Sequence, residues 1–221
     1  MSNLLNQEQY IVIIGDIIDS RKLSNRQEVQ TKLKNVLKEI NQQYAEEIMA
    51  KFVISLGDEF QGLLKKQGNV IKIISTIEEA LAPVKLRFGV GIGGINTEID
   101  FDNSLEIDGV AYYRARKMIQ EVENRQSQYV ESYSNIMICS SDESSRDDEL
   151  TNATLSVCTS LKSKWTNRQK EIISAYLRNC ENQYKTAEAL DIAQSSVNRA
   201  LRSAEFYSYK TAMNKVEAFL G

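Results

Sequence analysis

The architecture of this 221-residue chain follows from one stretch near its start, Tyr10-Ile-Val-Ile-Ile-Gly-Asp16. The run is apolar, rich in β-branched residues and closed by Gly-Asp, which is typical of a strand buried on both faces. Further along, the turn dipeptide Gly57-Asp58 separates the apolar runs 51–56 and 60–64. This spacing predicts a β-hairpin that follows the buried strand in the chain.

Helical and strand patterns alternate through the rest of the first part. Apolar residues recur at helical spacing in some segments and alternate with polar or small residues in others. The expected elements are helices at 29–44, 70–81 and 109–122 and strands at 84–92 and 135–139. The order of strands and helices therefore predicts an α+β domain built on one sheet.

Composition removes several classes of function. The chain has no histidine, which excludes Ser-His and Cys-His catalysis and histidine metal sites. Apolar runs are too short for a membrane span, and the N-terminus lacks a basic segment followed by an apolar one. The three cysteines have neither metal nor disulfide spacing, as expected in a reducing compartment. We therefore expect a cytoplasmic protein that has no membrane partner.

The two parts of the chain differ in charge. Residues 151–221 hold ten Lys and Arg against six Asp and Glu, whereas the first 150 residues are acidic. The most polar stretch, at 140–149, is the natural boundary, either as a flexible linker or as a fixed turn. We expect an α/β domain over 1–145 and a small all-α domain over 146–221, with different partners.

Two carboxylates follow the strands at positions where they can meet. Asp16 ends the first strand and Asp58 stands at the hairpin tip, so neighbouring strands would bring both to one edge of the sheet. Two carboxylates with the backbone carbonyl of Ile17 would suit Mg²⁺ or Mn²⁺ carrying a nucleoside triphosphate. Backbone amides after the strand could hold its phosphates, at Ile17, Ile18, Asp19, Ser20 and Arg21. Alternatively, both Gly-Asp pairs are ordinary turns.

These segments carry a resemblance to known families. Gly15-Asp-Ile-Ile18, Leu56-Gly-Asp-Glu-Phe60, Leu86–Gly93 and Val110–Arg116 resemble the landmarks of class III nucleotide cyclases and diguanylate cyclases over about residues 8–140. The resemblance implies a palm-like, ferredoxin-like fold in which Asp16 and Asp58 hold two metal ions. The whole chain resembles the SatD family.

The same resemblance assigns a transition-state role to Arg116, with Arg114 as its neighbour. One helical turn earlier, cyclases usually carry Asn, whereas this chain has Tyr112, and the residues that select the purine are not identifiable. The sequence therefore supports nucleotide binding better than it supports cyclisation of a nucleotide. Alternatively, both arginines lie on a solvated helix face.

The second part has the spacing of a helix-turn-helix. Thr166 can cap a helix reaching Leu177, and shorter helices follow at 184–191 and 195–204, with a turn between them. About residues 164–208 resemble the DNA-binding domain of bacterial transcription regulators. Residues expected to reach the DNA are Gln194, Ser195, Ser196, Asn198, Arg199 and Arg202. A three-helix packing module is the alternative.

The sequence thus favours a bacterial transcription regulator that binds Mg-nucleotide through its cyclase-like domain and DNA through its tail. A homodimer is expected, because a single helix-turn-helix binds DNA weakly and cyclase-like domains pair. One alternative is a metal-dependent nucleotide cyclase or nucleotidyl or phosphoryl transferase that uses Asp16 and Asp58. Another is a non-catalytic interaction scaffold.

Overall fold

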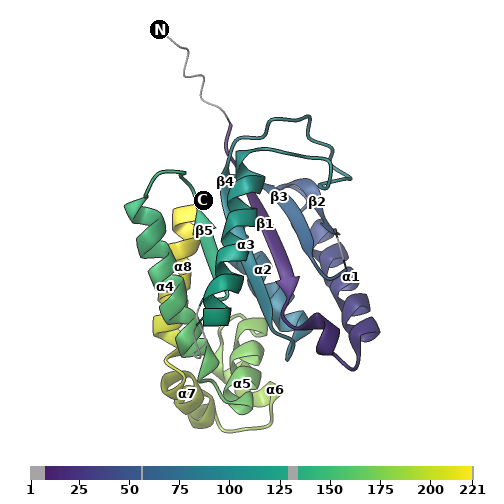
Figure 1. Cartoon of the computed structure of the whole chain (residues 1–221). Helices are drawn as coiled ribbons and strands as arrows, with labels where there is room; N and C mark the ends of the chain where they lie inside the picture. The colour runs from purple at the N-terminus through teal and green to yellow at the C-terminus, as the bar shows by residue number, and fades with distance from the viewer. Residues whose placement is uncertain (1–7, 56, 129–133, 221) are drawn as a thin grey trace.

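A computed structural model of the chain describes residues 8–55, 57–128 and 134–220. Its centre is a five-stranded sheet in the order β2-β3-β1-β4-β5 (Figure 1). The strands are β1 (Tyr10–Ile17), β2 (Ile48–Ile54), β3 (Phe60–Lys65), β4 (Leu86–Gly93) and β5 (Ile136–Cys139). The predicted strand 51–56 thus begins earlier and ends earlier than expected, and Leu56 lies outside the described residues.

The first strand occupies the middle of the sheet. β1 is antiparallel to both of its neighbours, with Ile13 opposite Gly62 of β3 and opposite Val90 of β4. β5 extends the sheet in parallel to β4. Every residue of β1 except Asp16 is buried, which confirms the strand that the apolar run predicts.

Helices cover both faces of this sheet. Helices α1 (Arg26–Gln43) and α2 (Val70–Leu81) pack on the face that holds Ile11 and Ile13. Helix α3 (Val110–Gln128) packs on the other face, against Val12 and Ile14. The alternation of β1 side chains between two helical layers explains why its sequence is apolar throughout.

Glycines in β4 let α3 lie directly on the sheet. A Cβ at Gly91 would stand 2.1 Å from the carbonyl oxygen of Ala111, and one at Gly89 would stand 2.2 Å from that of Ala115. These distances are far below contact, so any larger residue would push the helix away. The glycine alternation in β4 is therefore a packing requirement of α3.

The described residues after β5 form five helices: α4 (Arg146–Ser163), α5 (Asn167–Arg178), α6 (Gln183–Ala189), α7 (Gln194–Ser203) and α8 (Phe206–Leu220). The three predicted helices correspond to α5, α6 and α7, and Thr166 caps α5 in a reciprocal capping box with Gln169. Helices α4 and α8 were not expected. The end of the polar stretch 140–149, interpreted as a linker or turn, forms the first turn of α4 and is capped by Ser145.

Helices α4 and α8 join the core of the sheet. Leu155 and Cys158 of α4 and Met213 and Val216 of α8 belong to the same buried cluster as β1, α1 and α2. Figure 1 shows both helices beside β5, with α5, α6 and α7 at one end of the molecule. The predicted boundary after residue 145 coincides with the start of α4, and the independence of the two parts stays a prediction.

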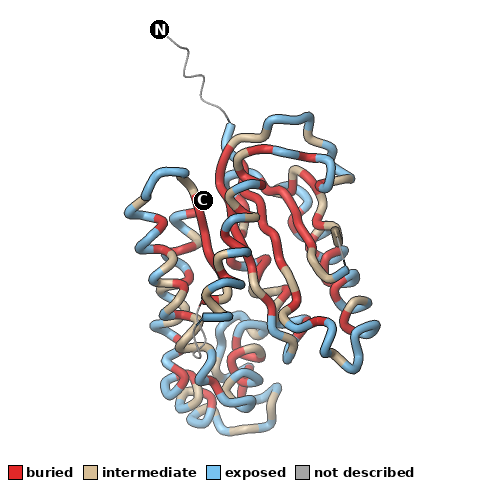
Figure 2. The backbone as a smooth tube through the Cα atoms, viewed as in Figure 1, coloured by how far each residue is buried: buried red, intermediate tan, exposed pale blue. Residues whose placement is uncertain are grey.

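Burial follows these layers. Figure 2 shows that the sheet is almost continuously buried and that the outer surfaces of the C-terminal helices are exposed. Within the described ranges, no helix is long and apolar enough to cross a membrane.

Candidate functional site

Asp16 and the hairpin tip meet at one end of the sheet. Gly15 pairs with Phe60 at the start of β3, so the turn that carries Asp58 and Glu59 lies next to the end of β1. The negative charges of Asp58 and Glu59 act on the Asp16 carboxylate. The structure therefore brings together the two carboxylates that the sequence singles out.

Arg87 is a close partner of Asp16 that the sequence analysis missed. It stands directly opposite Asp16 on β4, and its Nε and Nη2 donate to Oδ2 at 2.8 and 2.5 Å. Nη2 also lies 2.9 Å from Oε1 of Glu123 on α3. Burial raises the pKa of the Asp16 carboxyl; Arg87 opposes this rise, and the charges of Asp58 and Glu59 add to it. The only sequence signal for this partner is a basic residue within the alternating strand 84–92.

Arg116 reaches the same end of the sheet from α3. Its guanidinium forms an ion pair with the Glu59 carboxylate, which also accepts a hydrogen bond from the Ser55 hydroxyl at 2.8 Å. The side chain of Arg116 remains 41% exposed, so a ligand could still reach it. Arg116 thus lies next to the carboxylates of the hairpin tip, as the resemblance implies. Its ion pair with Glu59 is not predicted by the sequence.

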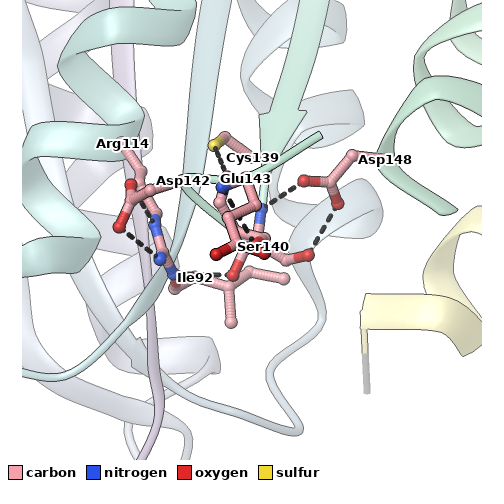
Figure 3. Close-up of polar contacts among 8 residues, drawn as sticks. Ile92, Arg114, Cys139, Ser140, Asp142, Glu143 and Asp148 are labelled. Atoms are coloured by element: carbon pink, nitrogen blue, oxygen red, sulfur yellow. Dashed lines mark hydrogen bonds and ion pairs between the residues drawn. The ribbon is translucent and has the colours of Figure 1, made fainter. Parts of the chain in front are cut away.

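Arg114 lies elsewhere, at the ends of β4 and β5 (Figure 3). Its Nη1 donates to the carbonyl oxygens of Ile92 and Ser140, each at 2.6 Å, and its Nε and Nη2 bind Asp142. With the side chain only 13% exposed, this arginine ties the strand ends to the loop before α4. These contacts indicate a structural role for Arg114. None of its partners belongs to the hairpin tip that carries Asp58 and Glu59.

Tyr112, which stands where cyclases usually carry Asn, faces the core. Its ring is buried in the cluster between α3 and the sheet, with 7% of the residue exposed. Among the described residues its hydroxyl has no hydrogen-bond partner, and burial raises its pKa. The hydroxyl of Tyr112 therefore makes no hydrogen bond to the carboxylate of Asp16 or of Asp58.

The segment after β1 turns sharply. The N–H of Ile18 donates to the carbonyl oxygen of Lys85 at 3.0 Å, so this amide is already bonded within the protein. Asp19 adopts a left-handed backbone with φ 55° and forms an ion pair with Lys22, while the short 3-10 helix Ser20–Lys22 follows. Ser20 is buried and Arg21 is exposed. Phosphate binding by this segment stays a prediction.

The residues fit a hard divalent cation in donor type, since Asp16 and Asp58 supply carboxylate oxygens. Oδ1 of Asp16 has no hydrogen-bond partner in the described part of the chain, and the crowding of Asp58 and Glu59 around Asp16 would be relieved by a cation. No group of three or more cysteine, aspartate or glutamate side chains with metal-binding geometry occurs in the described ranges. Beyond the two carboxylates, a cation would need other ligands, such as the predicted backbone carbonyl of Ile17 and a bound ligand.

The second candidate site is on α7. Val197 and Leu201 are fully buried against α5 and α6, and Trp165 fixes the end of α7 by donating its Nε1–H to the carbonyl oxygen of Ala204 at 2.7 Å. The opposite side of the helix is free to meet a ligand. Four of the six predicted DNA contacts are exposed and two are half-buried: Ser195, Ser196, Arg199 and Arg202, and then Gln194 and Asn198.

The exposed face of α7 is basic. Ser195, Asn198, Arg199 and Arg202 line a surface depression with Ser203. The helix contains no acidic residue, and no ion pair to Arg199 or Arg202 is found within the described residues. This face can therefore offer its positive charge to an external anion.

Solved structures provide distant comparisons. A bacterial light-regulated adenylyl cyclase is 15% identical, with a TM-score of 0.43 over 59% of this chain and 75% of that chain. The adenylyl cyclase CyaB from P. aeruginosa is 12% identical, with a TM-score of 0.39 over 65% and 80%. A regulator of polyketide synthase expression from Bifidobacterium adolescentis is 12% identical, with a TM-score of 0.30 over 96% and 86%.

Curated protein sequences yield no match to the chain. The model of the SatD family, by contrast, matches residues 10–219, almost the whole described chain. The expected α+β fold and the family resemblance are thus confirmed together: the chain belongs to the SatD family.

Proposed function

We propose that this protein is a cytoplasmic DNA-binding transcription regulator that contacts DNA through α7. The observation that carries the proposal is the exposed face of this helix, where Asn198, Arg199 and Arg202 line one surface depression and the helix has no acidic residue. Arginine and asparagine side chains suit phosphates and base edges in the major groove. Burial of Val197 and Leu201 holds this face outward.

An electrophoretic mobility shift with fragmented genomic DNA at low salt tests this proposal. The full chain should shift a subset of fragments, and the double variant Arg199→Ala/Arg202→Ala should bind far more weakly. The matched control is Lys34→Ala/Lys38→Ala, which removes the same charge from the exposed side of α1. If the full chain shifts no DNA, the proposal is wrong. It is also wrong if the two double variants lose binding equally.

The proposal includes a homodimer. One helix-turn-helix covers a single half-site, and specific binding usually requires two, about one helical turn of DNA apart. Sedimentation of the protein with and without DNA would establish the stoichiometry. One chain for each bound DNA duplex would rule out this part of the proposal.

A second candidate function is binding of a Mg-nucleotide at the end of the sheet. It is favoured by the meeting of Asp16 with Asp58 and Glu59, beside Arg87 and Arg116. Asp16 and Asp58 would hold the cation, and the exposed guanidinium of Arg116 could exchange Glu59 for a phosphate. A bound divalent cation would neutralise phosphate charge and polarise a phosphoryl group.

A thermal-shift screen of ATP, GTP, CTP and UTP, each with and without Mg²⁺, tests this candidate. A ligand that binds the native state raises the midpoint of unfolding, and Asp58→Asn should abolish the Mg²⁺-dependent part of the rise. Product detection then separates a binding domain from the alternative cyclase or transferase, whose activity must disappear in Asp16→Asn. The absence of any shift would favour the alternative of a non-catalytic scaffold.

A further inference from the structure

One residue of the proposed DNA surface is held in place before any DNA binds. Gln194 begins α7, and its Nε2 donates to Oε1 of Gln183 on α6 at 2.6 Å. The side chain of Gln194 is half-buried, unlike the exposed serines that follow it. The two glutamines therefore join the starts of the two helices of the helix-turn-helix.

Gln183 is itself fixed by a third helix. Its Nε2 donates to the hydroxyl of Tyr207 on α8 at 2.9 Å. The ring of Tyr207 packs edge-on against Phe206, at 5.8 Å between centroids. Burial raises the pKa of Tyr176 on α5 to about 12, and a hydrogen bond with Tyr207 adds to the rise. A polar network thus connects α5, α8 and α6 to the first residue of α7.

This network determines which way the Gln194 amide points. Because Gln183 donates to Tyr207 through its nitrogen, it presents its oxygen to Gln194 and accepts from the Gln194 nitrogen. One N–H and the Oε1 of Gln194 are left without a partner in the described part of the chain. A free donor and a free acceptor on one planar amide match the N7 and N6 positions on the major-groove edge of adenine.

We infer that Gln194 reads an adenine in the DNA site, and that Gln183 and Tyr207 are the positioning residues that orient it. The inference rests on the proposed DNA binding and deepens it by naming the base class that α7 recognises. Pre-orientation matters because a free glutamine must lose rotamer freedom when it binds.

The test begins with selection of binding sites from a random DNA pool by the full-length protein. The selected site should hold an adenine contacted by Gln194. Replacement of that adenine by 7-deazaadenine, which lacks the N7 acceptor, should weaken wild-type binding roughly tenfold. Gln194→Ala should bind natural and modified sites equally. A second variant, Gln194→Glu, should prefer cytosine at this position, because a carboxylate accepts from the cytosine amino group.

The positioning residues are tested by the ratio of the affinity for the natural site to the affinity for the 7-deazaadenine site. Gln183→Ala and Tyr207→Phe should reduce the 7-deazaadenine effect while still binding DNA, and Gln183→Glu, which keeps an acceptor for Gln194, should retain it. Arg202→Ala should weaken both sites alike and leave the ratio unchanged.

The outcomes separate the two proposals. If the wild-type protein retains no DNA from the pool, DNA binding fails and the inference fails with it; if it retains DNA without selecting a sequence, DNA binding stands and the inference is overturned. If it selects a sequence but Gln194→Ala keeps the same selection and the same 7-deazaadenine ratio, DNA binding stands and the inference is overturned. A ratio unchanged in both Gln183→Ala and Tyr207→Phe would overturn the positioning role alone.

Discussion

Burial and Arg87 act in opposite directions on the charge state of Asp16, one of the two carboxylates that the sequence singles out. Arg87 binds Asp16 across neighbouring strands, with both side chains less than one-fifth exposed. Burial favours the neutral form of Asp16, while the guanidinium favours the charged form. The capacity of Asp16 to hold a cation therefore depends on the balance between these two effects.

This balance predicts an unusual pH dependence. Cation binding needs the ionised carboxylate, and the pKa of Asp16 is raised, so Mn²⁺ affinity should fall as the pH falls through a range above that of an ordinary aspartate. Arg87→Ala removes the opposing effect, so its loss of affinity should begin at still higher pH. Calorimetric titration with Mn²⁺ at several pH values measures this shift.

The control is Lys85→Ala. This substitution removes a positive charge from an exposed position just before β4 and leaves the ion pair of Arg87 with Asp16 in place. Its pH profile should follow the wild type. A profile for Arg87→Ala that also coincides with the wild type would show that Asp16 does not bind the cation.

At this scale the sequence predicts that Asp16 and Asp58 lie at the same end of the sheet, but it does not predict their partners. Asp16 and Asp58 stand out because each follows an apolar run with Gly before it. The pairing of Asp16 with Arg87 depends on the register of two strands that are far apart in sequence, and local patterns do not define that register. Arg114 and Arg116 have the same local character, yet tertiary contacts place one at the strand ends and the other at the hairpin tip.

At the scale of helices, α2 is held at both ends by the C-terminal part. The Glu217 carboxylate of α8 accepts hydrogen bonds from the N–H groups of Ile71 and Lys72, at 2.7 and 3.3 Å, at the start of α2. Near the other end, Glu78 binds Lys162 of α4 at 2.6 Å, and Glu79 binds Arg178 of α5 at 3.0 Å. Glu217 thus supplies α2 with the N-terminal cap that its own Asn69 side chain does not provide.

Removal of this cap should destabilise the protein. Glu217→Ala leaves two N–H groups of α2 without their acceptor and should lower the free energy of unfolding by about 1–2 kcal/mol. Asn214→Ala, at an exposed position of the same helix, should change it by less than about 0.5 kcal/mol. Urea denaturation followed by circular dichroism measures both. Equal stabilities of the two variants would show that the cap contributes nothing.

The sequence predicts a helix well where the apolar side chains of the segment all pack into one cluster. The capping box of Thr166 and the inward stripe of Val197 and Leu201 locate α5 and α7 from local pattern alone. Helix α8 was missed because its apolar side chains serve two clusters, with Phe206 in the C-terminal core and Met213 in the core of the sheet. Helix α4 is not predicted because the polar stretch 140–149 indicates a linker or a turn, although acidic residues after Ser145 also favour a helix start.

For the whole molecule, the packing of α4 and α8 bears on how the two parts communicate. Helix α8 carries Tyr207, which contacts Gln183 of α6, and ten residues later it carries Glu217, which caps α2. One rigid helix therefore connects the core of the sheet with the network that reaches α7. A shift of α2 would therefore be passed through Glu217 to α8, and through Tyr207 to Gln183 at the start of α6.

The central claim is that the basic face of α7 contacts DNA phosphates and bases. Its most direct test is the salt dependence of DNA affinity for the wild type, Arg199→Ala/Arg202→Ala and the charge-matched Lys34→Ala/Lys38→Ala. Loss of phosphate contacts should reduce the slope of log affinity against log salt by about 0.9 for each contact removed. We predict a shallower slope for the arginine variant and an unchanged slope for the lysine variant. Identical slopes for all three proteins would contradict the claim.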